Sequence, residues 1–282
     1  MTERTPGIED VQNYWNRRPC NIRHSRQEVG TRAYFDEVEA RKYFIEPHIV
    51  PFADFSRWKG KKVLEIGCGI GTDTINFARA GAWVTAVDLS HESLALAQKR
   101  AATFGLSNIN FYYANAEKLT AAVPVETYDL VYSFGVIHHT PHPPAVINEI
   151  RNYMGPESTL KMMVYNRMSW KVLWIMLIYG KGAFWKLDKL IAQNSEAQTG
   201  CPVTFTYTEK TARDLLQGFS VIDCRIDHIF PYKISEYVNY RYRKTWYFRW
   251  ISSRLFRWME SRWGWHLMLT AKLSDKLSRP QV

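Results

Sequence analysis

The sequence predicts an α/β fold, a doubly wound sheet with mainly parallel strands. Two observations predict it. Short apolar runs typical of buried strands alternate with helical segments between residues 62 and 165, and such alternation indicates βαβ units. The first of these strands also runs directly into a loop with glycines at positions 67, 69 and 71 that opens a helix.

Each element follows from a local signal. Gly81 is placed to end the first helix, and Ser90 is a good N-cap for the second, which ends at Gly105. Val146, Ile147, Ile150 and Met154 lie on one face of a later helix that ends before Gly155. We therefore expect strands at residues 62–66, 83–87, 108–113, 128–133, 159–165, 220–226 and 265–273, and further helices at 74–80, 90–105 and 208–217.

The remaining segments do not fit this alternation. Residues 1–57 carry aromatic side chains near helical spacing and are expected to form an N-terminal helical cap. Residues 58–282 are expected to form one catalytic domain, which is interrupted by insertions at 166–205 and 229–264.

Composition narrows the location and the partners. The net charge of +10 favours anionic partners. The cysteines at 20, 68, 201 and 224 form no CxxC motif and no Cys/His cluster at zinc spacing, so no metal is expected. The apolar run at 172–179 is too short to span a bilayer, and residues 1–9 lack a secretory signal. We therefore expect a cytoplasmic protein with the option of peripheral contact with an anionic membrane; nothing indicates its oligomeric state.

The glycine loop indicates a ligand site. Glycines let a ligand lie against bare backbone, at the N–H groups of a helix N-terminus. A dinucleotide fingerprint needs glycine or alanine where this chain has Thr72, which disfavours a nicotinamide-dependent oxidoreductase, the alternative enzyme class. Asp88 ends the second strand, 17 residues after Gly71, where a carboxylate can accept hydrogen bonds from both ribose hydroxyls.

Five ordered motifs resemble class I S-adenosylmethionine (SAM)-dependent methyltransferases, especially the small-molecule group that includes the ubiquinone and menaquinone biosynthesis enzymes. They lie at residues 65–71, 84–90, 114–117, 128–131 and 136–139, and the resemblance extends more loosely to 206–228 and 265–273. Asn115 stands where the family usually has Asp, and residues 154–158 replace its usual Lys-Pro-Gly-Gly turn. The resemblance implies a Rossmann-like, seven-stranded sheet whose last strand is antiparallel.

The resemblance also implies the cofactor residues. SAM would be bound, and S-adenosylhomocysteine released, by Glu65, Gly67, Cys68, Gly69, Gly71, Asp88, Leu89, Asn115, Ala116, Glu117 and Ser133.

Two groups of side chains near the carboxyl ends of the strands are candidates for catalysis and acceptor binding. His138 and His139 follow the fourth strand; either acts as a general base toward a hydroxyl acceptor, with His139 preferred, or both only shape the pocket. Tyr165, Asn166 and Arg167 follow the fifth strand, and Arg167 either holds an acceptor carboxylate or phosphate or forms a structural salt bridge. We expect methyl transfer to oxygen of a small molecule, with nitrogen or carbon as alternatives.

The second insertion is unusually basic and aromatic. It holds eight basic residues against Glu236 and Glu260, a net charge of +6, together with four tryptophans. Three interpretations compete: a basic amphipathic helix packed on the domain, a lid over an aromatic, acyl or anionic acceptor, and contact with anionic membrane or nucleic acid. We expect the lid, with Trp246 and Trp250 against the acceptor. Nucleic-acid bases are disfavoured, because Ser-Phe-Gly-Val at 133–136 replaces the Asn/Asp-Pro-Pro-Tyr of base nitrogen methyltransferases.

Overall fold

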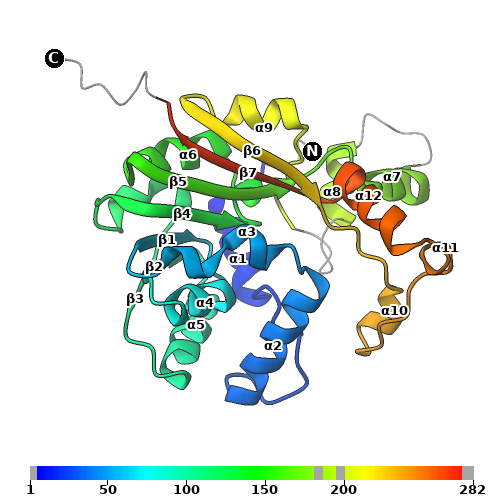
Figure 1. Cartoon of the computed structure of the whole chain (residues 1–282), viewed down its shortest axis with the longest axis horizontal. Helices are drawn as coiled ribbons and strands as arrows, with labels where there is room; N and C mark the ends of the chain where they lie inside the picture. Colours follow the sequence, from blue (N-terminus) through cyan, green and yellow to red (C-terminus); the bar gives the residue numbers. More distant parts are fainter. Residues whose placement is uncertain (1–4, 181–186, 195–200, 275–282) are drawn as a thin grey trace.

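A seven-stranded sheet forms the centre of the computed structural model, which describes residues 5–180, 187–194 and 201–274 (Figure 1). Neighbouring strands follow the order β3 (Ile109–Tyr113), β2 (Trp83–Asp88), β1 (Lys62–Ile66), β4 (Tyr128–Phe134), β5 (Met154–Tyr165), β7 (His266–Leu273) and β6 (Phe219–Asp227). The pairs from β3 to β5 are parallel, whereas β7 runs antiparallel to both β5 and β6. This confirms the α/β class and the antiparallel last strand that the resemblance implied.

Helices cover both faces of the sheet because its strands carry apolar side chains on both sides. Val63 and Val84 face one cluster, whereas Leu64 and Ile66 face the other. The first cluster is covered by α3 (Ile49–Ala53), the 3₁₀ helix η1 (Phe55–Trp58), α4 (Thr72–Arg79) and α5 (His91–Thr103). The second is covered by the 3₁₀ helix η2 (Ala116–Ala121), α6 (Pro143–Arg151) and α9 (Glu209–Leu215).

The N-terminal segment packs on the first of these helical layers. It contains α1 (Ile8–Arg17) and α2 (Arg32–Ile45), the latter capped by the Thr31 side chain. The fully buried Arg100 of α5 donates to Glu39 Oε2 of α2 at 2.8 Å and to Thr72 Oγ1 of α4 at 2.8 Å. Because a buried charge requires such partners, Arg100 ties α2 to the sheet domain. The division at residue 57 stays a prediction.

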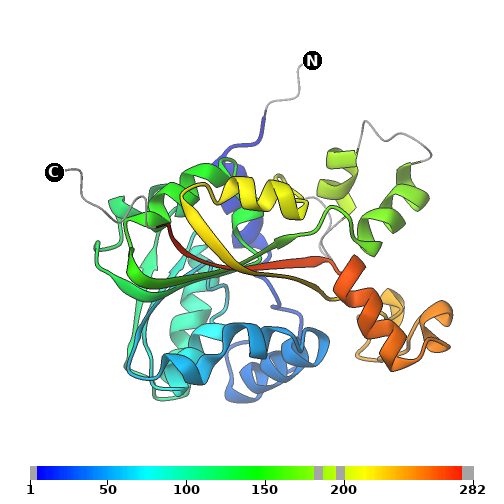
Figure 2. The same cartoon turned by 45° about the horizontal axis from the view of Figure 1, so that its top comes forward.

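Both insertions are largely helical. The first contains α7 (Trp170–Ile175), a π-helical turn (Met176–Gly180) and α8 (Leu187–Asn194), and the second contains α10 (Ile234–Tyr237), α11 (Trp246–Arg249) and α12 (Ser253–Trp263) (Figure 2). The start of the second insertion packs on α2: the Arg41 guanidinium lies 4.1 Å from the Tyr237 ring and 4.0 Å from the Tyr240 ring, and donates to the Tyr237 carbonyl at 2.6 Å. Segments far apart in sequence therefore lie side by side.

The predicted elements are present, but some boundaries were wrong. β5 begins at Met154, which we expected at the end of α6, and α6 ends at Arg151. The Ser158 hydroxyl donates to the Tyr128 carbonyl and accepts from the Gly155 N–H, which extends the pairing with β4 toward Met154. The first helix begins at Thr72 rather than residue 74. Within the described residues, no helix is long and apolar enough to cross a membrane.

Candidate active site

The loop between β1 and α4 shapes the site. Gly67, Gly69 and Gly71 adopt φ angles of +78°, +54° and +77°, a region that favours glycine. The N–H groups of Gly67 and Cys68 donate to the Val87 carbonyl at 2.7 and 2.9 Å, so the loop is attached to the end of β2. The loop therefore lies at the carboxyl edge of the sheet, where ligands bind in open α/β folds.

A cavity opens beside this loop. Its lining comes from the ends of β1, β2 and β4, from the residues after β3, and from the N-terminal segment. The described lining residues include Ile8, Val11, Trp15, Lys42, Gly67, Cys68, Gly69, Asp88, Leu89, Asn115, Ala116, Phe134, Val136, His139 and Thr140. The cavity thus combines bare backbone, one carboxylate and several apolar side chains.

Asp88 is the carboxylate of this cavity and is partly buried. Its Oδ2 accepts from the Gly69 N–H at 2.7 Å, and its Oδ1 accepts from the Ser90 N–H at 2.8 Å. These donors favour the ionised form, but burial has the larger effect and raises the pKa of Asp88 to about 6. The carboxylate is held rigidly at the end of β2 and is desolvated, so further donors from a ligand would stabilise its charge.

Asn115 and Ala116 line the cavity beyond β3. The Asn115 side-chain oxygen accepts from the Glu117 N–H at 2.9 Å and so caps η2. An amide oxygen has a second lone pair for a ligand. Glu117 instead accepts from the His142 N–H at 2.7 Å, and the described lining of the cavity does not include it.

Three other predicted cofactor residues also stand behind the described lining of the cavity. Glu65 is buried and accepts from the Thr74 hydroxyl at 2.5 Å, and burial raises its pKa to about 8. Gly71 precedes α4, where an added Cβ would lie 3.0 Å from the Ala97 Cβ. Ser133 is fully buried in β4. These residues shape the loop and strands rather than the cavity wall.

The two histidines of the short 3₁₀ helix η3 (Ile137–His139) differ in position. His139 lines the cavity, its ring lies 5.5 Å from that of Trp15, and its Nδ1 lies 2.9 Å from the Val203 carbonyl oxygen. His138 is fully buried, with its ring 3.8 Å from that of Tyr165. The described lining includes His139 but not His138, so the structure does not bring both predicted catalytic residues to the cavity.

The residues at the end of β5 contact the first insertion and the segment before β7. Tyr165 is buried, with its ring 4.1 Å from that of Trp265. Asn166 donates to the Gly264 carbonyl at 2.8 Å and accepts from the Met168 N–H at 3.0 Å. Arg167 lies 2.9 Å from Asp188 of α8, the salt bridge that was its alternative interpretation. The described lining of the cavity includes none of the three, and their contact with an acceptor stays a prediction.

Trp246 and Trp250 also lie away from the cavity. Their side chains are 74% and 84% exposed, and neither belongs to its described lining. The buried Phe248 between them anchors the insertion, with its ring 5.9 Å from that of Trp170 and 5.3 Å from that of Phe256. Because α11 packs Phe248 inward, the two tryptophans beside it lie in solvent, and their lid contact with an acceptor stays a prediction.

Sequence reasoning missed the contribution of the N-terminal segment. Trp15 and Lys42 line the cavity, and the Lys42 ammonium lies 2.7 Å from Asp73 Oδ1 in the first turn of α4. The aromatic spacing of residues 1–57 predicted helices, but it carried no signal for which of their faces meets the glycine loop.

Comparison with known proteins identifies relatives. Residues 58–217, more than half of the chain, match a family model described as a methyltransferase domain. The ubiquinone biosynthesis O-methyltransferase of Actinobacillus pleuropneumoniae is 34% identical over 111 residues, which cover 38% of this chain and 47% of that protein. The same-named enzyme of Salmonella paratyphi A is 31% identical over 121 residues, 43% and 48% of the two chains. The chain spans about half the length of these curated relatives.

Solved structures share the fold. The magnesium protoporphyrin IX methyltransferase of Synechocystis PCC 6803 with bound SAH has a TM-score of 0.55 and 17% identity, covering 94% of this chain and 98% of that one. The same enzyme with bound SAM has a TM-score of 0.55 and 15% identity, covering 97% and 100%. The likeness extends over nearly the whole chain.

The close approach of the loop to the segment after β4 predicts the effect of substituting Gly67. An added Cβ would meet Val136 Cγ2 at 2.2 Å, whereas a Cβ at Gly69 meets nothing within 4 Å. Both substitutions strain a positive φ, so Gly69→Ala is the matched control. We expect Gly67→Ala to lower the free energy of unfolding by about 1–3 kcal/mol more than Gly69→Ala does, measured by urea denaturation. Equal losses would show that Val136 yields without cost.

Proposed function

We propose, on the premise that this chain belongs to the family of methyltransferase domains, that it transfers the methyl group of SAM to an oxygen atom of a small molecule. The observation that carries the proposal is the position of Asp88, half-buried in the cavity wall at the glycine loop and hydrogen-bonded to the Gly69 N–H. The names of the ubiquinone biosynthesis O-methyltransferases support oxygen as the acceptor atom.

The cavity offers a complementary group to each part of SAM. We place the ribose hydroxyls against Asp88, the adenine beside Leu89, Asn115 and Ala116, and the methionine portion along the backbone of the glycine loop. Asp88 then accepts charge-assisted hydrogen bonds, while the apolar wall excludes water. Four residues outside the described lining of the cavity would support the loop and strands that form it: Glu65, Gly71, Glu117 and Ser133.

The acceptor would lie on the far side of the sulfonium, near Trp15, Phe134, His139 and Thr140. Methyl transfer is an in-line displacement at a carbon bound to positive sulfur. Holding the attacking oxygen on that line is therefore the main contribution of the protein. The aromatic wall favours a flat or partly apolar acceptor; a nitrogen or carbon nucleophile fits the same geometry and is the alternative.

His139 is the candidate general base. A proton on Nδ1, donated to the Val203 carbonyl 2.9 Å away, leaves the lone pair on Nε2. A hydroxyl acceptor gains nucleophilicity if that nitrogen removes its proton during attack. His138 is buried against Tyr165 and is not proposed as a base.

The exposed part of the second insertion supports contact with an anionic membrane rather than a lid. Its four tryptophans, Trp246, Trp250, Trp258 and Trp263, are exposed, and so are its eight basic side chains: Lys233, Arg241, Arg243, Lys244, Arg249, Arg254, Arg257 and Arg262. Exposed tryptophans next to arginines are complementary to the interface of an acidic bilayer, where each basic residue contributes about 1 kcal/mol. This surface would place the enzyme near a lipid-like acceptor.

The role assigned to Asp88 predicts both the strength and the pH dependence of SAM binding. Asp88→Ala removes two charge-assisted hydrogen bonds of about 1.5–3 kcal/mol each and should weaken SAM binding by about 10²–10⁴-fold in calorimetric titration. Because burial raises the pKa of Asp88 to about 6, the carboxylate gains a proton as the pH falls through that value, and affinity should fall with it. Asp88→Asn should bind weakly at every pH. Unchanged affinity in these variants, or tight NADH binding by the unaltered protein, contradicts the proposal.

Substitution of His139 distinguishes a base from a residue that only lines the cavity. His139→Ala should lower turnover by about 10²–10⁴-fold while SAM affinity stays nearly intact. Turnover is measured as the release of S-adenosylhomocysteine when the protein is incubated with SAM and each of a panel of phenolic and hydroxylated compounds. His91→Ala, which removes an exposed histidine, is the control. Full activity of His139→Ala would point instead to an acceptor that is already ionised, such as a carboxylate.

Binding to lipid vesicles tests the proposed membrane contact of the second insertion. The protein should co-sediment with vesicles containing phosphatidylserine, and 0.5 M salt should release it, because exposed charges are screened. Replacing both Trp246 and Trp250 by serine should weaken binding. The control is Trp83→Ser, which removes a tryptophan that is 61% exposed. Trp83 begins β2 and therefore lies at the amino edge of the parallel strands, opposite the carboxyl edge that carries the cavity. Absence of vesicle binding, together with a raised acceptor KM in the double variant, would favour the lid.

A further inference from the structure

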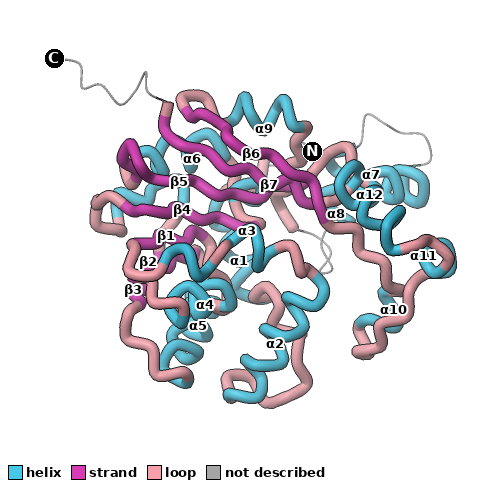
Figure 3. Tube along the Cα trace, in the orientation of Figure 1, coloured by secondary structure: helices cyan, strands magenta, loops and turns pink. Residues whose placement is uncertain are grey.

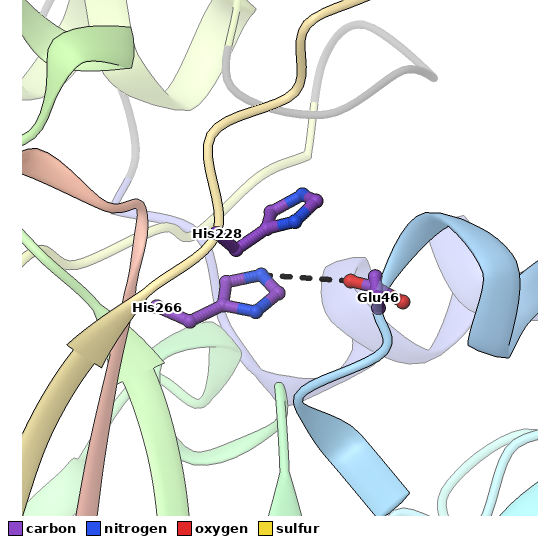
Figure 4. Close-up of side chains that lie close together, drawn as sticks. All are labelled: Glu46, His228 and His266. Atoms are coloured by element: carbon purple, nitrogen blue, oxygen red, sulfur yellow. Dashed lines mark ion pairs between the residues drawn. The ribbon is translucent and has the colours of Figure 1, made fainter. Parts of the chain in front are cut away.

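A second group of polar side chains lies beside the cavity, outside the site already described. It consists of Glu46 at the end of α2, His48, His228 after β6 and His266 at the start of β7, and is called the histidine cluster below. The three imidazoles are buried. Figure 4 shows the His228 and His266 rings side by side, with Glu46 approaching them from the neighbouring helix end.

Three members of the cluster each have one potential metal-ligand atom close to those of the other two. One atom each from Glu46, His228 and His266 lie within 4.8 Å of one another, and His266 Nε2 lies 3.6 Å from Glu46 Oε1. Ligands of one transition metal, each about 2.0–2.2 Å from it, lie roughly 3–4 Å apart. Small side-chain rotations would therefore bring all three atoms into contact with one ion.

His48 and Asp227 orient the cluster from behind. His48 Nε2 and His266 Nδ1 are 2.8 Å apart and share one hydrogen bond, and His48 Nδ1 lies 3.9 Å from Asp227 Oδ1. When His266 Nδ1 donates this proton to His48, the Nε2 lone pair of His266 points toward Glu46 and is available to a cation. Ligating histidines commonly have such a partner on their other nitrogen.

The position of His228 is fixed by its backbone. It adopts a φ of +73°, uncommon for a residue other than glycine, its carbonyl accepts from the Trp265 N–H at 2.7 Å, and its own N–H donates to Asp227. Strain of this kind persists where the surrounding structure imposes it and is concentrated at functional sites.

We propose that Glu46, His228 and His266 bind a divalent transition metal ion. Two imidazoles and one carboxylate suit Zn²⁺, Fe²⁺, Co²⁺ or Ni²⁺, whereas Mg²⁺ prefers oxygen ligands. Three protein ligands leave at least one coordination position for a further molecule.

The cluster adjoins the proposed acceptor position. The ring of Phe134, which lines the cavity, lies 5.5 Å from that of His266 and 6.1 Å from that of His48. None of the cluster's side chains belongs to the described lining of the cavity, so a metal ion there would reach the acceptor only if Phe134 moved aside. Bound to the acceptor oxygen, it would lower the pKa of the hydroxyl and strengthen the nucleophile. This role rests on the proposed function, whereas metal binding itself does not.

Metal binding is tested on the untagged full chain. After removal of metals with EDTA, Co²⁺ is added, and bound cobalt is measured by elemental analysis and by its visible absorption. We expect one ion per chain, displaced by one equivalent of Zn²⁺. His228→Ala and Glu46→Gln should abolish stoichiometric binding, and His48→Ala should weaken it about 10–100-fold. His91→Ala is the control and should bind normally.

Titration of the same samples with SAM distinguishes loss of the metal site from misfolding and from failure of the proposed function. A variant that loses cobalt but binds SAM is folded and supports the site. If His228→Ala fails to fold, Glu46→Gln, whose side chain is 22% exposed at a helix end, provides the test. Sub-stoichiometric cobalt in the unaltered protein, or equal binding by all variants, overturns the metal site. Loss of SAM binding by the unaltered protein would overturn the proposed function instead.

Discussion

The close contact between the loop after β1 and the segment after β4 is the constraint on which the site depends. Gly67 has no side chain where a Cβ would fall 2.2 Å from Val136, so the loop can turn across the edge of the sheet and deliver the Gly69 N–H to Asp88. The same turn starts α4, whose Asp73 receives Lys42 from the N-terminal segment. The cavity, its carboxylate and the N-terminal cap are therefore positioned by one tight crossing of two backbone segments.

Buried charges of this protein occur with partners that join distant segments. Arg100 on α5 binds Glu39 on α2, Lys42 binds Asp73 on α4, and Arg41 lies between aromatic rings of the second insertion. Such pairs contribute little net stability but cost much when broken, so they specify which surfaces meet. They explain how residues 5–57 and 229–264, which supply no strand, enclose one end of the sheet.

The second insertion combines two surfaces with different chemistry. Its inner side carries Phe248 against Trp170 and Phe256, which is ordinary core packing. Its outer side exposes tryptophans among arginines, a composition that water alone does not favour. Between the insertion and the cavity lies the histidine cluster, so one end of the molecule brings together the cofactor site, the candidate metal site and the candidate membrane surface.

The sequence by itself determined the strands of the sheet (Figure 3) and the glycine loop, because these depend on local signals: short apolar runs that alternate with helical segments, glycines after β1 and a carboxylate at the end of β2. The antiparallel direction of the last strand was implied only by the resemblance to the methyltransferase family. Boundaries failed where a side chain such as Ser158 extended a strand by tertiary hydrogen bonds. Only the tertiary structure decided that His139 and not His138 reaches the cavity, that Trp15 and Lys42 line it, and that Trp246 and Trp250 do not. Only it assembled Glu46, His228 and His266, because residues so far apart in sequence have no spacing that could indicate a shared ligand; the folding of β6, β7 and α2 against one another creates their proximity.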